Sequence, residues 1–437
     1  MLTILLIAPE YPPSYPVGYA RTAAFEKYLP EFGFQTAVLT TRSYGTLPTD
    51  GAHHVYRALD AGMLYLPLTR RFLPSPRPRA PGIPTAGSAV SPFRSTLKIV
   101  LSATQELAKN VLVPDFQVTW LPAALWGGRH ALRDERADMI YSSSPPETAH
   151  LVAGLLSHFM RTPWVADFRD GWLFESLKPP LRQNGWRRWL EQRLERWTVT
   201  QASAVVTVSQ PITDYFCKTY ADMSHKFHTI PNGYDPDDWQ GVQPKPRDPT
   251  RFRLVYTGAL AHSRPSLDPQ PFLCALAAWP LSMRDCLEVV LVGTLGEAEQ
   301  RLVTELSLDG TVRILGQKSK AESLAYQLSA DVLLLIAGKD RSVATSKLYE
   351  YLYAGRPILA LATPDGAAAQ IVTQTQAGEV VDPTDSVAIA VALTRLFDRW
   401  RENKLTGQTR AIEAYHRRNL TRQLADVFSA VLSERGR

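Results

Sequence analysis

The chain has 437 residues, of which 45% are hydrophobic and 21% charged, and its formal net charge is +6. This composition is typical of a folded globular protein and excludes wholesale disorder, while the length predicts two or three domains. Three cysteines without CxxC spacing argue against a disulfide framework or a zinc site and favour a reducing cytoplasm.

The sequence also limits the kinds of partner. It has no run of about 18 apolar residues, so it predicts no membrane-spanning helix. The positive charge is spread along the chain and no nucleic-acid-binding module is recognised, which disfavours nucleic acid as a partner. A nucleotide phosphate or an anionic membrane surface would suit this charge equally well.

Short apolar strands alternate with helices in the first half of the chain. Leu2–Ala8 is predicted to be a buried strand, and Thr22–Phe32 the helix that follows it. The Pro- and Arg-rich segment 66–94 interrupts the pattern and predicts a long surface loop. Further strands are predicted at Thr36–Thr40, Asp138–Ser142, Trp164–Phe168 and Ala204–Ser209.

The second half repeats this alternation after the turn-rich segment IPNGYDPDDW, which is interpreted as a linker. We therefore predict an α/β protein with two doubly wound, Rossmann-like domains at 1–235 and 245–416. The C-terminal tail, Glu402–Arg437, is predicted to be mostly helical, with 417–437 packing back on the first domain. The second-half strands are predicted at Arg253–Thr257, Leu287–Gly293, Val312–Leu315, Val332–Ile336 and Pro357–Ala362.

One segment carries a specific resemblance. Thr345–Gly366, TSKLYEYLYAGRPILALATPDG, is similar to the donor-binding signature of the family 4 glycosyltransferases, and DFRDGW, VTVSQPITDYF, IPNGYD and YTGAL fall in the matching order. The resemblance implies the GT-B architecture, in which two Rossmann-like domains face each other across a cleft that holds the donor. It also implies that a hexose-type sugar moves, with retention, from a UDP or GDP donor to a hydroxyl of a lipid-linked, oligosaccharide or polysaccharide acceptor. No metal or other cofactor is implied.

Two residues of that segment are the leading donor-site candidates. Lys347 opens a predicted helix, whose N-terminal N–H groups and positive dipole end would suit a diphosphate. Its charge would also stabilise the leaving nucleotide diphosphate, and the alternative is a solvated surface lysine. Glu350 lies one turn further on and could accept hydrogen bonds from the ribose hydroxyls. The alternative for Glu350 is an intrahelical ion pair with Lys347.

Further donor-site candidates lie in loops. Arg264 follows YTGALAHS and could grip the diphosphate, because a guanidinium binds phosphate in a bidentate manner. Gly18 would let the backbone approach the diphosphate closely, or else it only forms a turn. The resemblance predicts Glu at the position of Ser342, and this departure leaves the identity of the donor sugar open. The donor sugar and base are expected near Ser342, Thr345, Ser346, Gly316 and Gln317.

Two carboxylates at the end of a first-half strand are candidates for the catalytic role. Asp170 and, less strongly, Asp167 could orient the acceptor hydroxyl or take its proton. The alternative is a structural pairing between an aspartate and Arg169 that holds the loop.

The segment WRRWLEQRLERW, Trp186–Trp197, is basic and aromatic. A helix of this kind can lie on an anionic membrane, and it can equally be an ordinary helix with its Trp face inside and its Arg face in water. We therefore expect a cytoplasmic protein, with peripheral contact at the inner face of the membrane under the first interpretation.

Two other functions fit the same sequence. A nucleotide-sugar epimerase on the same fold would need no acceptor. A degenerate, non-catalytic nucleotide-sugar-binding subunit is the other alternative, because Ser342 stands where the resemblance predicts Glu.

Overall fold

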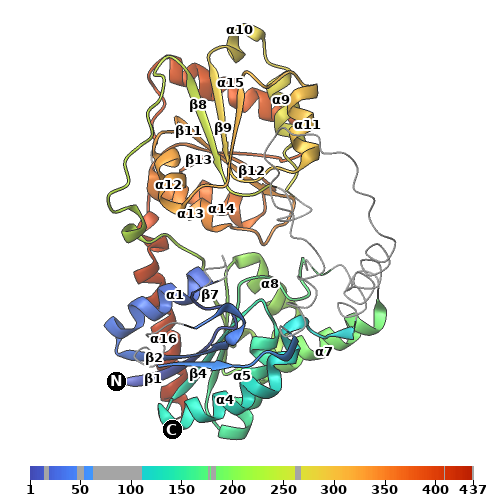
Figure 1. Cartoon of the computed structure of the whole chain (residues 1–437), viewed down its shortest axis with the longest axis vertical. Coiled ribbons are helices and arrows are strands. Elements are labelled where there is room, and N and C mark those ends of the chain that lie inside the picture. The colour runs from blue at the N-terminus through green and yellow to red at the C-terminus, as the bar shows by residue number, and fades with distance from the viewer. Residues whose placement is uncertain are drawn as a thin grey trace, which may run out of the picture. The chain divides into compact units, whose positions relative to one another are not determined.

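The computed structural model describes residues 1–13, 19–46, 54–62, 111–175, 178, 184–260, 267–407 and 409–435. Within these residues the chain forms two compact units, each built on its own sheet (Figure 1). Unit 1 comprises Met1–Val206, Asp222–His228 and Ala425–Arg437, and unit 2 comprises Thr207–Ala221 and Thr229–Leu424. The fold class predicted from the sequence is confirmed, with two Rossmann-like α/β domains.

The first sheet has seven strands in the order β3-β2-β1-β4-β5-β6-β7. Strand β1 lies between β2 and β4 and is parallel to both, and Ile4 to Ile7 are completely covered. Such apolar runs are typical of parallel strands buried on both faces. The strands are β1 (Leu2–Ile7), β2 (Phe34–Thr41), β3 (Val55–Ala58), β4 (Met139–Ser144), β5 (Trp164–Phe168), β6 (Ala204–Thr207) and β7 (Phe227–Thr229).

Helices connect these strands and cover the sheet. Helix α5 contacts both α4 and α7, so the three form one layer (Figure 1). Its apolar residues pack on strand β4. The helices of unit 1 are α1 (Tyr19–Tyr28), α4 (Leu121–Asp134), α5 (Thr148–Met160) and α7 (Gly185–Gln201). Helix α8 (Gln210–Thr219) joins β6 to β7 in the chain and belongs to unit 2.

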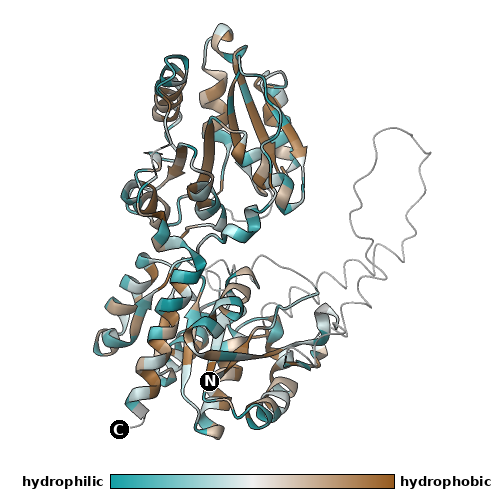
Figure 2. Ribbon diagram, turned by 90° about the vertical axis from the view of Figure 1, so that its left-hand side faces the viewer, coloured by the Kyte–Doolittle hydropathy of each residue, from teal (hydrophilic) through white to brown (hydrophobic). Residues whose placement is uncertain are grey.

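The second sheet has six strands in the order β10-β9-β8-β11-β12-β13. Successive residues of β8 serve opposite faces: Leu254 and Tyr256 enter the core beneath α9 and α15, and Val255 enters the core beneath α13 and α14. The strands therefore stand out as the most hydrophobic part of this unit (Figure 2). They are β8 (Phe252–Thr257), β9 (Leu287–Val292), β10 (Val312–Gly316), β11 (Val332–Gly338), β12 (Ile358–Ala362) and β13 (Gly378–Val381).

The helices of the second unit lie on both faces of its sheet. Helices α9, α11 and α15 bury side chains in one core, and α13 and α14 bury theirs in the other. The helices are α9 (Gln270–Ala277), α10 (Leu281–Arg284), α11 (Glu297–Glu305), α12 (Lys320–Leu328), α13 (Ser346–Ala354), α14 (Ala367–Gln374) and α15 (Ser386–Arg401).

The C-terminal helix α16 spans Arg417–Arg435, and its residues from Ala425 onward belong to unit 1. There Phe428 meets the rings of Phe34 and Tyr141 at centroid distances of 5.6 and 6.0 Å. The tail is mostly helical, as predicted, and among the described residues of 402–416 the helical part is the 3-10 turn Ile412–Tyr415.

Several helices and strands were not predicted: the short strands β3, β7 and β13 and the helices α4, α10 and α15. The predicted loop at 66–94 lies outside the described residues. In the part of the chain that is described, no helix is long and apolar enough to cross a membrane.

Candidate functional site

The carboxyl edge of the second sheet is shaped by glycines. Strands β8, β9, β10 and β11 end in or just before Gly258, Gly293, Gly316 and Gly338, all with positive φ. At two of them a side chain has no room. A Cβ on Gly258 would lie 2.0 Å from Nζ and Cε of Lys347, and one on Gly293 would lie 2.0 Å from the Gly258 carbonyl oxygen. The glycines therefore let Lys347 and the neighbouring backbone pack closely at the edge where ligands of doubly wound sheets bind.

Lys347 occupies the space that Gly258 leaves. Its Nζ donates a hydrogen bond of 2.9 Å to the Tyr256 hydroxyl, and burial lowers its pKa to about 8, although Glu350 opposes this shift. Among the described residues, no carboxylate forms an ion pair with Lys347. Lys347 is therefore a largely buried cation without a counter-ion and not a solvated surface lysine.

The N-terminus of α13 completes an anion site around this lysine. Thr345 is the N-cap residue, yet its side chain makes no capping bond, and its buried Oγ1 has no hydrogen-bond partner in the described part of the chain. Ser346 and Lys347 form the first turn, whose N–H groups have no partner within the helix. A hydroxyl, free N–H groups and an ammonium therefore lie together, an arrangement suited to a phosphate group.

Glu350 lies on the next turn of α13 but is not paired with Lys347. Its Oε1 accepts from Lys320 of α12, and its Oε2 accepts from Gln327 at 2.9 Å. The Gln327 amide also donates to Thr257 at the end of β8, at 3.0 Å. Two neighbouring elements thus hold the carboxylate at the carboxyl edge, and the alternative of an intrahelical Lys347 pair is wrong.

The other donor-site candidates are distributed along the same edge or are not described. Ser342 follows β11 and is 8% exposed, so a larger side chain would have to displace its surroundings. Gly316 ends β10 with φ +67°, and Gln317 is exposed beyond it. Arg264 and Gly18 lie outside the described residues.

Asp167 in unit 1 is buried, and both of its carboxylate oxygens accept hydrogen bonds from neighbouring side chains. Arg21 donates to both of its oxygens, at 2.9 and 3.0 Å, while Tyr141 and Ser143 donate at 2.7 and 2.8 Å. Burial alone would raise the pKa of Asp167, but Arg21 and these donors hold it below its usual value. The Asp167 carboxylate has no exposed surface that an acceptor could contact in this structure, and this environment favours the structural alternative over a catalytic role.

Asp170 and Arg169 follow β5 and are partly exposed. Arg169 donates to the backbone carbonyls of Ser144, at 3.2 Å, and Pro145, so it fastens two strand ends together. Glu10 follows β1. Burial raises its pKa, and the positive charge of Arg169 opposes this shift. The sequence analysis missed Glu10, as it missed Tyr256, Lys320 and Gln327, because no motif marks them and only folding brings them to a site.

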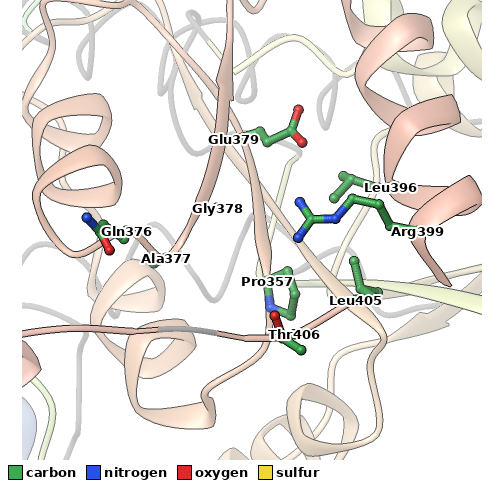
Figure 3. Close-up of a pocket in the computed structure, with 9 residues that line it drawn as sticks. All are labelled: Pro357, Gln376, Ala377, Gly378, Glu379, Leu396, Arg399, Leu405 and Thr406. Atoms are coloured by element: carbon green, nitrogen blue, oxygen red, sulfur yellow. The ribbon is translucent and has the colours of Figure 1, made fainter. Parts of the chain in front are cut away.

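The cavity drawn in Figure 3 lies at the opposite edge of the second sheet. It has a volume of about 210 Å³ and is lined by Pro357 and Ala377, which precede β12 and β13, and by Leu396 and Arg399 of α15. Because ligands of such sheets bind at the carboxyl ends of the strands, we assign this cavity no part in donor binding.

Two family models match the chain. The Glycosyltransferase Family 4 model matches residues 21–238, and the Glycosyl transferases group 1 model matches residues 251–399. No curated protein sequence matches the chain.

Solved structures share the fold at low identity. Sucrose-phosphate synthase from Thermosynechococcus elongatus is 16% identical with a TM-score of 0.66, over 99% of this chain and 100% of that one. Anabaena HepE in complex with UDP-glucose is 16% identical with a TM-score of 0.60, over 98% and 100%. WaaG, a glycosyltransferase involved in lipopolysaccharide biosynthesis, is 15% identical with a TM-score of 0.56, over 97% and 99%.

Proposed function

Since this chain belongs to the family 4 glycosyltransferases of GT-B fold, we propose that it transfers a hexose-type sugar from a UDP or GDP donor, with retention. The acceptor is a hydroxyl of a lipid-linked, oligosaccharide or polysaccharide molecule. The protein works in the cytoplasm, at the inner face of the membrane.

The observation that carries the proposal is the buried, uncompensated ammonium of Lys347 at the N-terminus of α13. A nucleotide diphosphate supplies the missing negative charge, and its ribose hydroxyls donate to Glu350 one turn away. The shared fold of HepE, whose structure holds UDP-glucose, supports a donor of this class.

The reaction breaks the bond between the sugar's anomeric carbon and the diphosphate oxygen and forms a bond to the acceptor oxygen. Lys347 and the α13 dipole stabilise the negative charge that develops on the leaving diphosphate, so no metal is needed for this task. The acceptor hydroxyl gives up its proton as the new bond forms, and Asp170 orients that hydroxyl or takes its proton. Arg264 and the Gly18 backbone are the proposed additional diphosphate contacts.

The first experiment is a thermal-stability measurement of the full chain with UDP-, GDP-, ADP- and dTDP-sugars, with EDTA present throughout. A ligand that binds only the native state raises the midpoint by mass action. We expect one donor to stabilise the wild type and to leave Lys347→Ala and Glu350→Ala unchanged. If no nucleotide shifts the midpoint, the proposed donor site is wrong.

Product analysis without an acceptor separates transfer from epimerisation. An epimerase converts its nucleotide sugar into an isomer when no acceptor is present, whereas the proposed transferase leaves the donor intact. Accumulation of an isomeric nucleotide sugar under these conditions would contradict the proposal.

A further inference from the structure

Helix α7 buries charged side chains and exposes large aromatic ones, which is the reverse of an ordinary surface helix. Its two acidic residues, Glu191 and Glu195, are completely buried together with Arg187, while Trp186 and Trp189 are 53% and 55% exposed. The alternative derived from the sequence, with the Trp face inside and the Arg face in water, is therefore wrong for these residues. Burying charged groups while exposing large apolar ones is unfavourable, so each face needs an explanation.

The inward charges hold the segment that follows β5. Glu191 accepts from Trp172 Nε1 at 2.8 Å, from Arg187 at 2.8 Å and from Lys178 at 3.0 Å. Glu195 accepts from the backbone N–H of Leu173 at 3.0 Å. The inner face of α7 therefore holds the residues just beyond Asp170 in place.

The outward face combines two tryptophans with arginine. Arg193 and Arg196 are exposed on the same side of the helix as the two tryptophans, and the Arg193 guanidinium lies over the Trp189 ring, 4.7 Å from its centroid. Because both glutamates of the helix point inward, no acidic residue of α7 offsets these charges outside. The face is cationic and aromatic, the composition that suits the boundary between anionic headgroups and acyl chains.

We propose that the outer face of α7 lies on an anionic lipid surface. Trp186 and Trp189 enter the headgroup boundary, and Arg193 and Arg196 meet lipid phosphates. The inner face of the same helix holds the segment after Asp170. Helix α7 would therefore contact the membrane on one side and the acceptor-side loop on the other. This inference deepens the proposed function, on which it rests for a lipid-linked acceptor.

The test is co-sedimentation of the full chain with vesicles of phosphatidylcholine alone or of an equimolar phosphatidylcholine–phosphatidylglycerol mixture. We expect binding to the mixed vesicles only, with a blue shift of tryptophan fluorescence. Trp186→Ala with Trp189→Ala should abolish the blue shift and most of the binding. Each of Arg193→Gln and Arg196→Gln should weaken binding about fivefold.

Trp126→Ala is the matched control, because Trp126 is 72% exposed on α4 and lies outside this face. It should leave vesicle binding unchanged. Equal binding to both kinds of vesicle, equal binding by the α7 variants, or an equal loss in Trp126→Ala would overturn the inference. Vesicle binding needs no donor, and the α7 variants should keep the nucleotide-induced thermal shift, so this outcome is independent of that of the donor site.

Discussion

The ammonium of Lys347 and the phenol of Tyr256 are joined by a 2.9 Å hydrogen bond, and the same ammonium lies 4.7 Å from the centre of the Tyr256 ring. Burial raises the pKa of Tyr256, so the phenol stays neutral and does not cancel the lysine charge. The site therefore holds a desolvated cation against a π-face and a neutral oxygen, which orient it without neutralising it. A diphosphate that binds here would pair with an ammonium that is already oriented.

Replacing Lys347 with Met should stabilise the ligand-free protein while it removes nucleotide binding. The substitution keeps an unbranched chain but relieves the desolvation of the ammonium, and each kcal/mol relieved raises Tm by roughly 2–4 °C in a domain of this size. Scanning calorimetry with and without UDP checks both effects. Lys318→Met is the control, since Lys318 is exposed and its substitution should leave the ligand-free Tm nearly unchanged. A lower ligand-free Tm for Lys347→Met would contradict the desolvation argument.

The lowered pKa of Lys347 also sets a pH dependence. Its pKa in the fold is about 8, against 10.5 ordinarily, so between these values the unfolded chain binds more protons and this group's contribution to stability rises with pH. Diphosphate affinity should change in the opposite direction and fall as pH rises above about 8, because the ammonium loses its proton. Calorimetric titration of UDP from pH 7 to 9.5 measures this decline. Lys347→Arg, which stays protonated, should give a flatter profile; a wild-type affinity independent of pH would exclude Lys347 from the diphosphate site.

The sequence predicted the elements of both sheets well because their strands are apolar runs bounded by turns, as in Leu287–Val292. Lys347 and Glu350 were predictable as a pair because both lie in one contiguous segment. The environment of that pair was not, since Tyr256, Gln327 and Lys320 come from three other elements and no local pattern marks them. The partners of individual charged residues could not be predicted for the same reason. No sequence feature shows that Arg21 reaches Asp167 from 146 positions away.

Gly258→Ala should weaken nucleotide binding without removing any group that contacts the ligand. Its Cβ would lie 2.0 Å from the Lys347 ammonium, and φ at this position is +129°, so both the side chain and the backbone must shift. We expect a fall in UDP affinity comparable to that of Lys347→Ala, measured by calorimetric titration. Gly241→Ala is the control, because Gly241 also has a positive φ but no atom within 4 Å of the added Cβ. Equal losses in both variants would point to backbone strain alone.

Glu350→Gln should reduce affinity for ribonucleotides more than for deoxyribonucleotides. Hydrogen bonds to a carboxylate are roughly twice as strong as those to a neutral amide, and a loss of about 1.4 kcal/mol is a tenfold change in affinity. The measurement compares UDP with 2′,3′-dideoxy-UDP on wild type and variant. If the carboxylate accepts the ribose hydroxyls, the wild type prefers UDP and the variant loses most of that preference. An unchanged preference would leave Glu350 as a partner of Lys320 and Gln327 only.

Asp167→Asn and Asp170→Asn should fail in different ways. Asp167 is the buried partner of Arg21, and its neutralisation leaves a desolvated guanidinium uncompensated, which typically costs about 3–5 kcal/mol. We therefore expect Asp167→Asn to lower the midpoint of urea unfolding strongly, and Asp170→Asn, in a partly exposed loop, to leave it nearly unchanged. Once a donor and an acceptor are known, Asp170→Asn should lower kcat while the donor-induced thermal shift persists, because Asp170 is assigned to the acceptor side. If Asp167→Asn kept full stability and lost activity, the catalytic role would return to Asp167 and the Arg21 pair would be dispensable for folding.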